Sequence, residues 1–269
     1  MSQSVLVAGP WVGEFGYELF RWQGHLRALA PKYDRVIVAS RPGHELLYKD
    51  FADFVPVDTD PNPCEGPFND VNLDPTPYIE KVFGHIPYYH SIHPCVKFSD
   101  SQPTKYIPFG QGSDSMPYDI VFHARGITIE DQAAMVKDHT KMKLNRNWPE
   151  ESWNELVTEF HNHGFTMACI GDPRSAWKLP HCTDMRGIPL HDLADLLGNS
   201  DWIIGPSSGP MHFASLCKCK QLVWGTPHLH ARYEQLWNPF GTYVRLMECD
   251  EQWNPSVGDV IYEFLKCNE

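Results

Sequence analysis

The stretch GPSSGPMHFASL, residues Gly205–Leu216, determines how the second half of this chain is interpreted. It follows directly on an apolar run, Trp202–Ile204, that is typical of a buried strand. Pro210 suits the first position of a helix, because its missing N–H would have no partner there. Amides of a first helical turn, with the hydroxyls of Ser207 and Ser208, favour a phosphate or diphosphate. The alternative is an ordinary polar turn between strand and helix.

The glycines do not follow the common nucleotide-binding patterns. Gly205–Leu216 lacks the Gly-Lys-[Ser/Thr] ending of a Walker loop, so ATP hydrolysis is not predicted. The segment GPWVGEFG, behind the first apolar run, has the wrong spacing for G-x-G-x-x-G. Any phosphate site must therefore be of another kind.

Strand and helix patterns alternate through both halves of the chain. Apolar, β-branched runs such as Ser4–Gly9, Arg35–Ser40 and Tyr118–Gly126 predict buried strands. An amphipathic helix is predicted over Trp148–Gly164, with proline in its first turn and glycine after its last. Such alternation indicates an α/β fold with parallel sheets. The proline-rich residues 59 to about 117 predict loops, short helices and a boundary between lobes 1–112 and 113–269.

Composition limits the partners of the protein. The chain has 269 residues, with 22 Lys+Arg against 34 Asp+Glu, and the net charge of −12 disfavours nucleic acid or an anionic membrane. No apolar stretch reaches the ~18 residues of a membrane span, and MSQSVLVAGPW enters a strand without a signal peptide. The 8 cysteines and 14 histidines show no metal-ligand spacing, so no metal site is predicted. We expect a cytoplasmic protein with reduced thiols.

Several motifs follow one another between residues 118 and 228. In chain order they are Trp148-Pro149, Gly171-Asp172-Pro173, Asp195 with Asp201, Ser208–Ala214 and Gly225-Thr226-Pro227. Together they resemble the donor-binding half of GT-B glycosyltransferases of the heptosyltransferase type. The resemblance implies two Rossmann-like lobes facing a cleft. It assigns the nucleotide-sugar donor to lobe 113–269, and the acceptor and catalytic loop to lobe 1–112.

The resemblance also implies which residues hold the donor. Its diphosphate is expected against Ser207, Ser208, Gly209 and His212, and further donor contacts are expected from Gly13, Gly171 and Asp172. Independently of the resemblance, Arg146 is a further candidate phosphate contact. For His212, packing within the helix is the alternative.

Arg125 is a further candidate phosphate ligand. His123-Ala124-Arg125 ends a predicted strand and resembles the His-x-Arg motif of GT-B fucosyltransferases. The planar guanidinium of an arginine bonds two phosphate oxygens at once. The alternatives are a surface ion pair of Arg125 with Asp119 or Glu130, and a partly buried strand histidine at 123.

The loop after the first predicted strand supplies the candidate catalytic base. Relatives of this type show Gly-Asp there, whereas this sequence offers Glu14 and Glu18. Glu14 is favoured by its place in the Gly-rich loop, since Glu18 falls inside the predicted helix 17–29 and is suited to capping. Counting back from Leu26–Leu29 favours Glu18 instead. Ordinary acids at a helix N-terminus are the third interpretation.

The sequence thus predicts an enzyme that moves a sugar from a nucleotide-diphosphate sugar to an acceptor hydroxyl. The transfer is expected to be inverting, metal-independent and without a cofactor. The first alternative is a metal-dependent GT-A enzyme, because Asp58-Thr59-Asp60 forms a D-x-D. The second is a non-catalytic module that binds a phosphorylated ligand. The acceptor stays open among a glycan, a lipid-linked glycan, a protein and a modified nucleobase, the last disfavoured by the acidic charge.

Overall fold

The chain divides into two compact units, Met1–Ile107 (unit 1) and Pro108–Glu269 (unit 2). The boundary expected from the sequence lay after residue 112. The computed structural model describes residues 4–11, 13–58, 74, 76–86, 89–92, 102–110, 118–126, 147–249 and 254–268.

Unit 1 is built on a four-stranded parallel sheet with the order β3-β2-β1-β4. The strands are β1 (Val5–Ala8), β2 (Arg35–Ser40), β3 (Asp53–Pro56) and β4 (His90–Ile92). Both β1 and β2 were expected from their apolar runs. The strand β4 lies where only loops and short helices were predicted. The sequence did not indicate it, because its three residues are largely exposed and carry no apolar pattern.

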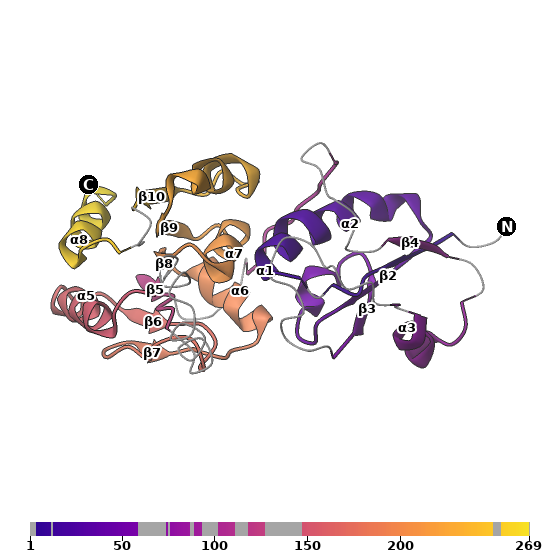
Figure 1. Ribbon diagram of the computed structural model, residues 1–269, viewed down its shortest axis with the longest axis horizontal. Coiled ribbons are helices and arrows are strands. Elements are labelled where there is room, and N and C mark those ends of the chain that lie inside the picture. The colour runs from indigo at the N-terminus through magenta and orange to yellow at the C-terminus, as the bar shows by residue number, and fades with distance from the viewer. Residues whose placement is uncertain are drawn as a thin grey trace, which may run out of the picture. The chain divides into compact units, whose positions relative to one another are not determined.

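Helices cover both faces of this sheet (Figure 1). One continuous helical stretch follows β1 and consists of α1 (Phe15–Tyr17), a π-helical turn (Glu18–Trp22) and α2 (Gln23–Leu29). On the other face lies α3 (Thr76–Phe83). Its Ile79 packs in one apolar cluster with alternating apolar side chains of β1 and β2 and with Val55 of β3. Short 3-10 turns, Ala30–Lys32 and Glu45–Leu47, complete the helices that the structure describes here.

Unit 2 holds a six-stranded parallel sheet with the order β10-β9-β8-β5-β6-β7. The strands are β5 (Ile120–Phe122), β6 (Met167–Cys169), β7 (Thr183–Asp184), β8 (Trp202–Pro206), β9 (Lys220–Gly225) and β10 (Val244–Glu248). Its core joins buried side chains of β5, β8 and β9 to a group of tryptophans and phenylalanines. The α/β class and the two separate parallel sheets confirm the prediction.

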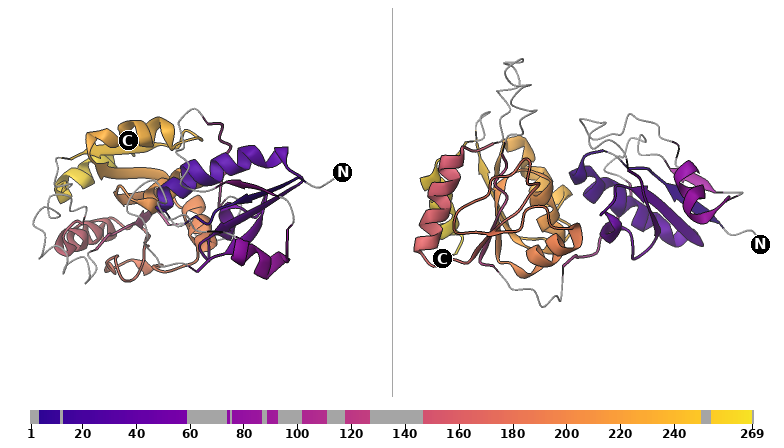
Figure 2. Two further views of the ribbon diagram at one scale, coloured as in Figure 1. Left: turned by 45° about the vertical axis from the view of Figure 1, so that its right-hand side comes forward. Right: turned by 90° about the horizontal axis from the view of Figure 1, so that it is seen from below.

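Among the described residues of unit 2, four α-helices lie against this sheet. They are α5 (Glu150–Asn162), α6 (Leu190–Asn199), α7 (Gly209–Cys217) and α8 (Val257–Lys266). In Figures 1 and 2, α5 and α8 lie on one face of the sheet, and α6 and α7 on the other. Within the described ranges, no helix combines the length and apolar character that crossing a membrane requires.

Candidate functional site

The order in which the chain adds strands to the sheet of unit 2 reverses between β5 and β8. From β5 the chain adds β6 and β7 on one side, then crosses to add β8, β9 and β10 on the other. Open α/β sheets bind ligands in the crevice outside the carboxyl ends of the strands at such a switch point. His123 follows β5, Ser208 follows β8, and the Nδ1 and Oγ atoms of this pair share a hydrogen bond of 2.8 Å. These two side chains therefore mark the switch point.

Predicted donor residues follow the carboxyl ends of three neighbouring strands, β8, β5 and β6. They are Arg125 after β5, Gly171 and Asp172 after β6, and Ser207, Ser208, Gly209 and His212 after β8. Arg146 lies outside the described residues. The structure thus brings all but one of the unit 2 candidates to one edge of the sheet.

Gly171 allows the strand ends to approach closely. Its φ is +123°, and a Cβ there would lie 2.7 Å from the Cβ of Ala176 and 3.2 Å from the imidazole of His123. A side chain here would clash with Ala176 and crowd the imidazole of His123. The glycine predicted from the sequence is therefore required by the packing of this edge.

The His123 imidazole is neutral at neutral pH. Burial, with the neighbouring charge of Arg125 as a second cause, lowers the pKa of His123 to about 3. A neutral ring still exchanges a hydrogen bond with the Ser208 hydroxyl. Of this pair of neighbours, Arg125 alone carries positive charge.

Arg125 is held at a defined strand end. It forms an antiparallel β-bridge with Ala176, and the amides of Gly126 and Trp177 bond across this bridge at 2.7 Å each. Of the two alternative partners, Asp119 accepts hydrogen bonds from the backbone and hydroxyl of Thr166, and Glu130 lies outside the described residues. The Arg125 side chain is half-buried.

The start of α7 presents amides and hydroxyls. The amide of His212 donates a helical hydrogen bond of 3.1 Å to the carbonyl of Ser208. The amides of Gly209 and Met211 precede it, and first-turn amides have no acceptor within their own helix. The Ser207 hydroxyl accepts a hydrogen bond of 3.0 Å from Tyr233. A hydroxyl that accepts one bond can still donate its own proton to a phosphate oxygen.

His212 is packed among aromatic rings. It stacks on Tyr233 with ring centroids 4.5 Å apart, and meets Trp237 edge-on at 4.6 Å. Its packing role is thus evident, while donation to a phosphate stays a prediction. Asp172 is exposed and ion-paired with Arg174 across 2.6 Å, and the hydrogen bond from Arg174 lowers the pKa of that carboxyl.

The candidate base loop of unit 1 follows β1. Gly13 is buried with its Cα against the indole of Trp11, where a Cβ would approach to 3.0 Å. Glu14 is the N-cap residue of α1, and its exposed side chain makes no capping hydrogen bond. Its position suits a base that contacts a substrate, and that role stays a prediction.

Glu18 occupies a different environment from Glu14. Its carboxylate is fully buried and is bonded by the hydroxyls of Ser40 (2.5 Å) and Tyr48 (2.7 Å) and by Nδ1 of His44 (2.8 Å). Burial raises the pKa of Glu18, but the nearby His44 and the three hydrogen bonds outweigh it, so the pKa lies below its usual value. Glu18 therefore does not act as a helix cap.

Sequence reasoning missed the partners of Glu18. Ser40 ends β2, and His44 and Tyr48 flank the 3-10 turn that follows it. The available signal was topological, because β1 and β2 are parallel neighbours whose carboxyl ends meet at one edge. Polar residues just after both strands were therefore candidates for contact.

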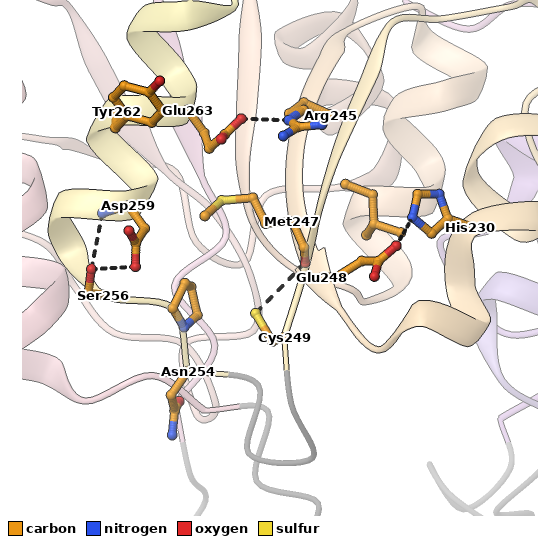
Figure 3. Close-up of a pocket in the computed structure, with 12 residues that line it drawn as sticks. His230, Arg245, Met247, Glu248, Cys249, Asn254, Ser256, Asp259, Tyr262 and Glu263 are labelled. Carbon is orange, nitrogen blue, oxygen red and sulfur yellow. Dashed lines mark hydrogen bonds and ion pairs between the residues drawn. The ribbon is translucent and has the colours of Figure 1, made fainter.

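A separate cavity of about 640 Å³ lies beside β10 and the start of α8 (Figure 3). None of the predicted donor residues lines it. Its charged groups pair with one another, as Arg245 with Glu263 and His230 with Glu248. No group of three metal-ligating side chains gathers among the residues that were described. Asp58 follows β3, and Asp60 lies outside that set.

Three solved structures are similar to this chain along nearly its whole length. A glycosyl transferase family 9 protein from Veillonella parvula has a TM-score of 0.57 at 12% identity, covering 99% of this chain and 98% of that one. E. coli ADP-heptose lps heptosyltransferase II has 0.56 at 11%, covering 99% and 98%. E. coli heptosyltransferase WaaC with ADP-2-deoxy-2-fluoro heptose has 0.57 at 11%, covering 99% and 100%.

The chain has this glycosyltransferase fold. The resemblance to heptosyltransferase-type GT-B enzymes, predicted from the motifs, is confirmed at the level of fold. No protein-family model and no curated protein matches the sequence.

Proposed function

We propose that this protein is a glycosyltransferase that moves a sugar from a nucleotide-diphosphate sugar to an acceptor hydroxyl. The observation that carries the proposal is the gathering of predicted donor residues at the switch point of unit 2, within a chain of glycosyltransferase fold. One similar structure holds ADP-2-deoxy-2-fluoro heptose. An ADP-linked heptose is therefore the first donor to test.

On the donor side, unit 2 stabilises the leaving diphosphate. Arg125 supplies charge-assisted hydrogen bonds, and the amides at the start of α7 supply neutral ones. The hydroxyls of Ser207 and Ser208 complete this set of donors. Such preorganised groups stabilise the charge that develops as the sugar departs. We propose that they do so without a metal ion.

On the acceptor side, a group of unit 1 takes the proton of the acceptor hydroxyl. The hydroxyl oxygen bonds to the anomeric carbon as the bond from that carbon to the phosphate oxygen breaks. A single displacement of this kind inverts the anomeric configuration. Glu14 is the exposed carboxylate of the predicted catalytic loop. A cytoplasmic location remains a prediction.

The test begins with binding and then measures chemistry. Thermal unfolding is recorded with ADP, GDP, UDP and CDP, because a ligand of the native state stabilises it by mass action. Hydrolysis of ADP-heptose and other nucleotide sugars is then followed with and without EDTA. Cleavage that EDTA leaves unchanged supports the proposal. Cleavage abolished by EDTA supports the D-x-D alternative, and binding without cleavage of any donor supports a non-catalytic module.

A further inference from the structure

We propose that His44 takes the proton of the acceptor hydroxyl and that Glu18 positions His44 for this step. The inference rests on the proposed glycosyl transfer and names a different base from the one the sequence favoured. It is carried by the geometry of one buried carboxylate and one half-buried imidazole within unit 1.

The carboxylate is fixed in place. Glu18 is 0% exposed, and its Oε1 atom accepts from both Ser40 and Tyr48. The Tyr48 hydroxyl keeps its proton, because burial and the charge of Glu18 raise its pKa well above the usual range. With Oε1 so held, Oε2 faces Nδ1 of His44 at 2.8 Å. A carboxylate this enclosed reaches a substrate only through the imidazole.

The imidazole presents its other nitrogen. The side chain of His44 is 19% exposed, whereas that of Glu18 is 0% exposed. Nδ1 points to the carboxylate, and Nε2 has no hydrogen-bond partner among the described residues. A carboxylate at Nδ1 favours the tautomer whose proton sits on Nδ1, leaving a lone pair on Nε2. This is the arrangement in which an acid orients a histidine base.

His44 lies beside the predicted catalytic loop. Its ring packs against that of Phe15, with centroids 5.4 Å apart, and Phe15 directly follows Glu14. The residue comes four positions after the end of β2 and so belongs to the carboxyl edge of the sheet, where α/β proteins place their chemistry.

The proposed step balances as follows. Nε2 of His44 accepts the proton of the hydroxyl while its oxygen bonds to the anomeric carbon. The nucleoside diphosphate leaves with the electron pair of the broken carbon–oxygen bond. The resulting imidazolium is stabilised by the Glu18 carboxylate until the proton passes to solvent. Glu18 is thus a positioning residue, and His44 is the group that meets the substrate.

The test uses His44→Asn in the full chain, with ADP-heptose and the other nucleotide sugars as donors and water as acceptor. The asparagine amide takes the place of Nδ1 toward Glu18, which preserves folding, but it offers no basic nitrogen. We expect donor hydrolysis to fall by about 10²–10⁴, with nucleoside diphosphate affinity unchanged. Free imidazole should restore part of the activity of His44→Ala, a rescue that a merely structural role would not show.

Two substitutions of Glu18 test whether it positions His44. Glu18→Asp should retain more hydrolysis than Glu18→Gln, and imidazole should rescue neither, because the native imidazole is still present. His85→Ala is the matched control, since His85 bonds Glu80 through Nδ1 at 2.9 Å on the exposed surface of the same unit. We expect hydrolysis by that variant to equal the wild-type rate.

The outcomes separate this inference from the proposed function. If the wild-type protein cleaves the donor and His44→Asn cleaves it at a near-normal rate, the role of His44 is overturned and the proposed function stands. A larger loss in Glu14→Gln than in His44→Asn returns the role to Glu14. Failure of the wild-type protein to bind or cleave any nucleotide sugar overturns the proposed function and the base with it.

Discussion

His44 in unit 1 and His123 in unit 2 both follow a parallel strand at its carboxyl end, but their neighbours have opposite charge. His44 bonds the buried carboxylate of Glu18, whereas His123 lies near Arg125 and bonds a hydroxyl. A carboxylate stabilises an imidazolium, and a guanidinium opposes one. The same side chain is therefore suited to accepting a proton in one unit and to staying neutral in the other.

The largest effect is expected from removing the charge of Glu18. Glu18→Gln leaves His44 and two hydroxyls facing an amide in a fully buried place. Breaking a buried pair in this way costs about 3–5 kcal/mol. Urea unfolding followed by tryptophan fluorescence measures the change in the free energy of unfolding, with Glu80→Gln as the exposed control. A cost as small as that of the control would mean that the carboxylate is dispensable to unit 1.

Arg125→Ala should weaken donor binding without unfolding unit 2. The lost charge-assisted bonds are worth about 1.5–3 kcal/mol, or about 10- to 150-fold in affinity. Calorimetric titration with the nucleoside diphosphate that stabilises the protein most gives this ratio. If Arg125→Ala and Ser208→Ala both bind as the wild type does, the edge of unit 2 is only a turn.

The lowered pKa of His123 should make the free energy of unfolding depend on pH. Its pKa is about 3 in the folded protein against 6.5 for the unperturbed group, so between these values the unfolded chain binds more protons. Stability is therefore fully present above about pH 6.5 and falls as the pH drops toward 3, by up to about 1.4 kcal/mol per pH unit. His123→Asn should flatten this slope in urea unfolding at pH 7, 6 and 5. Parallel slopes in both proteins would contradict a neutral, buried His123.

The smallest expected effect is the difference between two matched tyrosines. Tyr48 donates to the charged Glu18, and Tyr233 donates to the neutral hydroxyl of Ser207. Bonds to charged groups are worth about 1.5–3 kcal/mol and neutral ones about 0.5–1.5 kcal/mol. Tyr48→Phe should therefore cost more than Tyr233→Phe in the same unfolding assay. Equal costs would indicate that the carboxylate of Glu18 is not charged in the folded state.

Strong local patterns made most of the fold predictable. β1, β2 and β8 are apolar runs, and α7 begins beside the proline that indicated its start. β7 and β4 escaped prediction because they have two and three residues and are mostly exposed. Strands this short form because a neighbouring strand offers hydrogen bonds, and a single sequence contains no sign of that neighbour.

The candidate site could be predicted where it depends on residues adjacent in the sequence. Ser207, Ser208 and Gly209 stand together in the chain, so their motif indicated a ligand directly. The contact between Glu18 and His44 joins residues 26 positions apart. It exists because two strand ends meet, and neither residue alone distinguishes it from a surface acid and a surface histidine. For the same reason, the sequence left Glu14 and Glu18 as alternatives.

The π-helical turn Glu18–Trp22 acts as a register shift within the stretch from Phe15 to Leu29. A π turn holds one residue more than the α geometry would at that point. Winding the same residues as a regular α-helix, at 3.6 residues per turn, would rotate everything upstream by roughly 100° relative to α2. Glu18 would then turn away from Ser40, His44 and Tyr48, although no side chain of that group had been altered. The number of residues in this turn, as much as their chemistry, sets which acid of the loop is enclosed and which faces solvent.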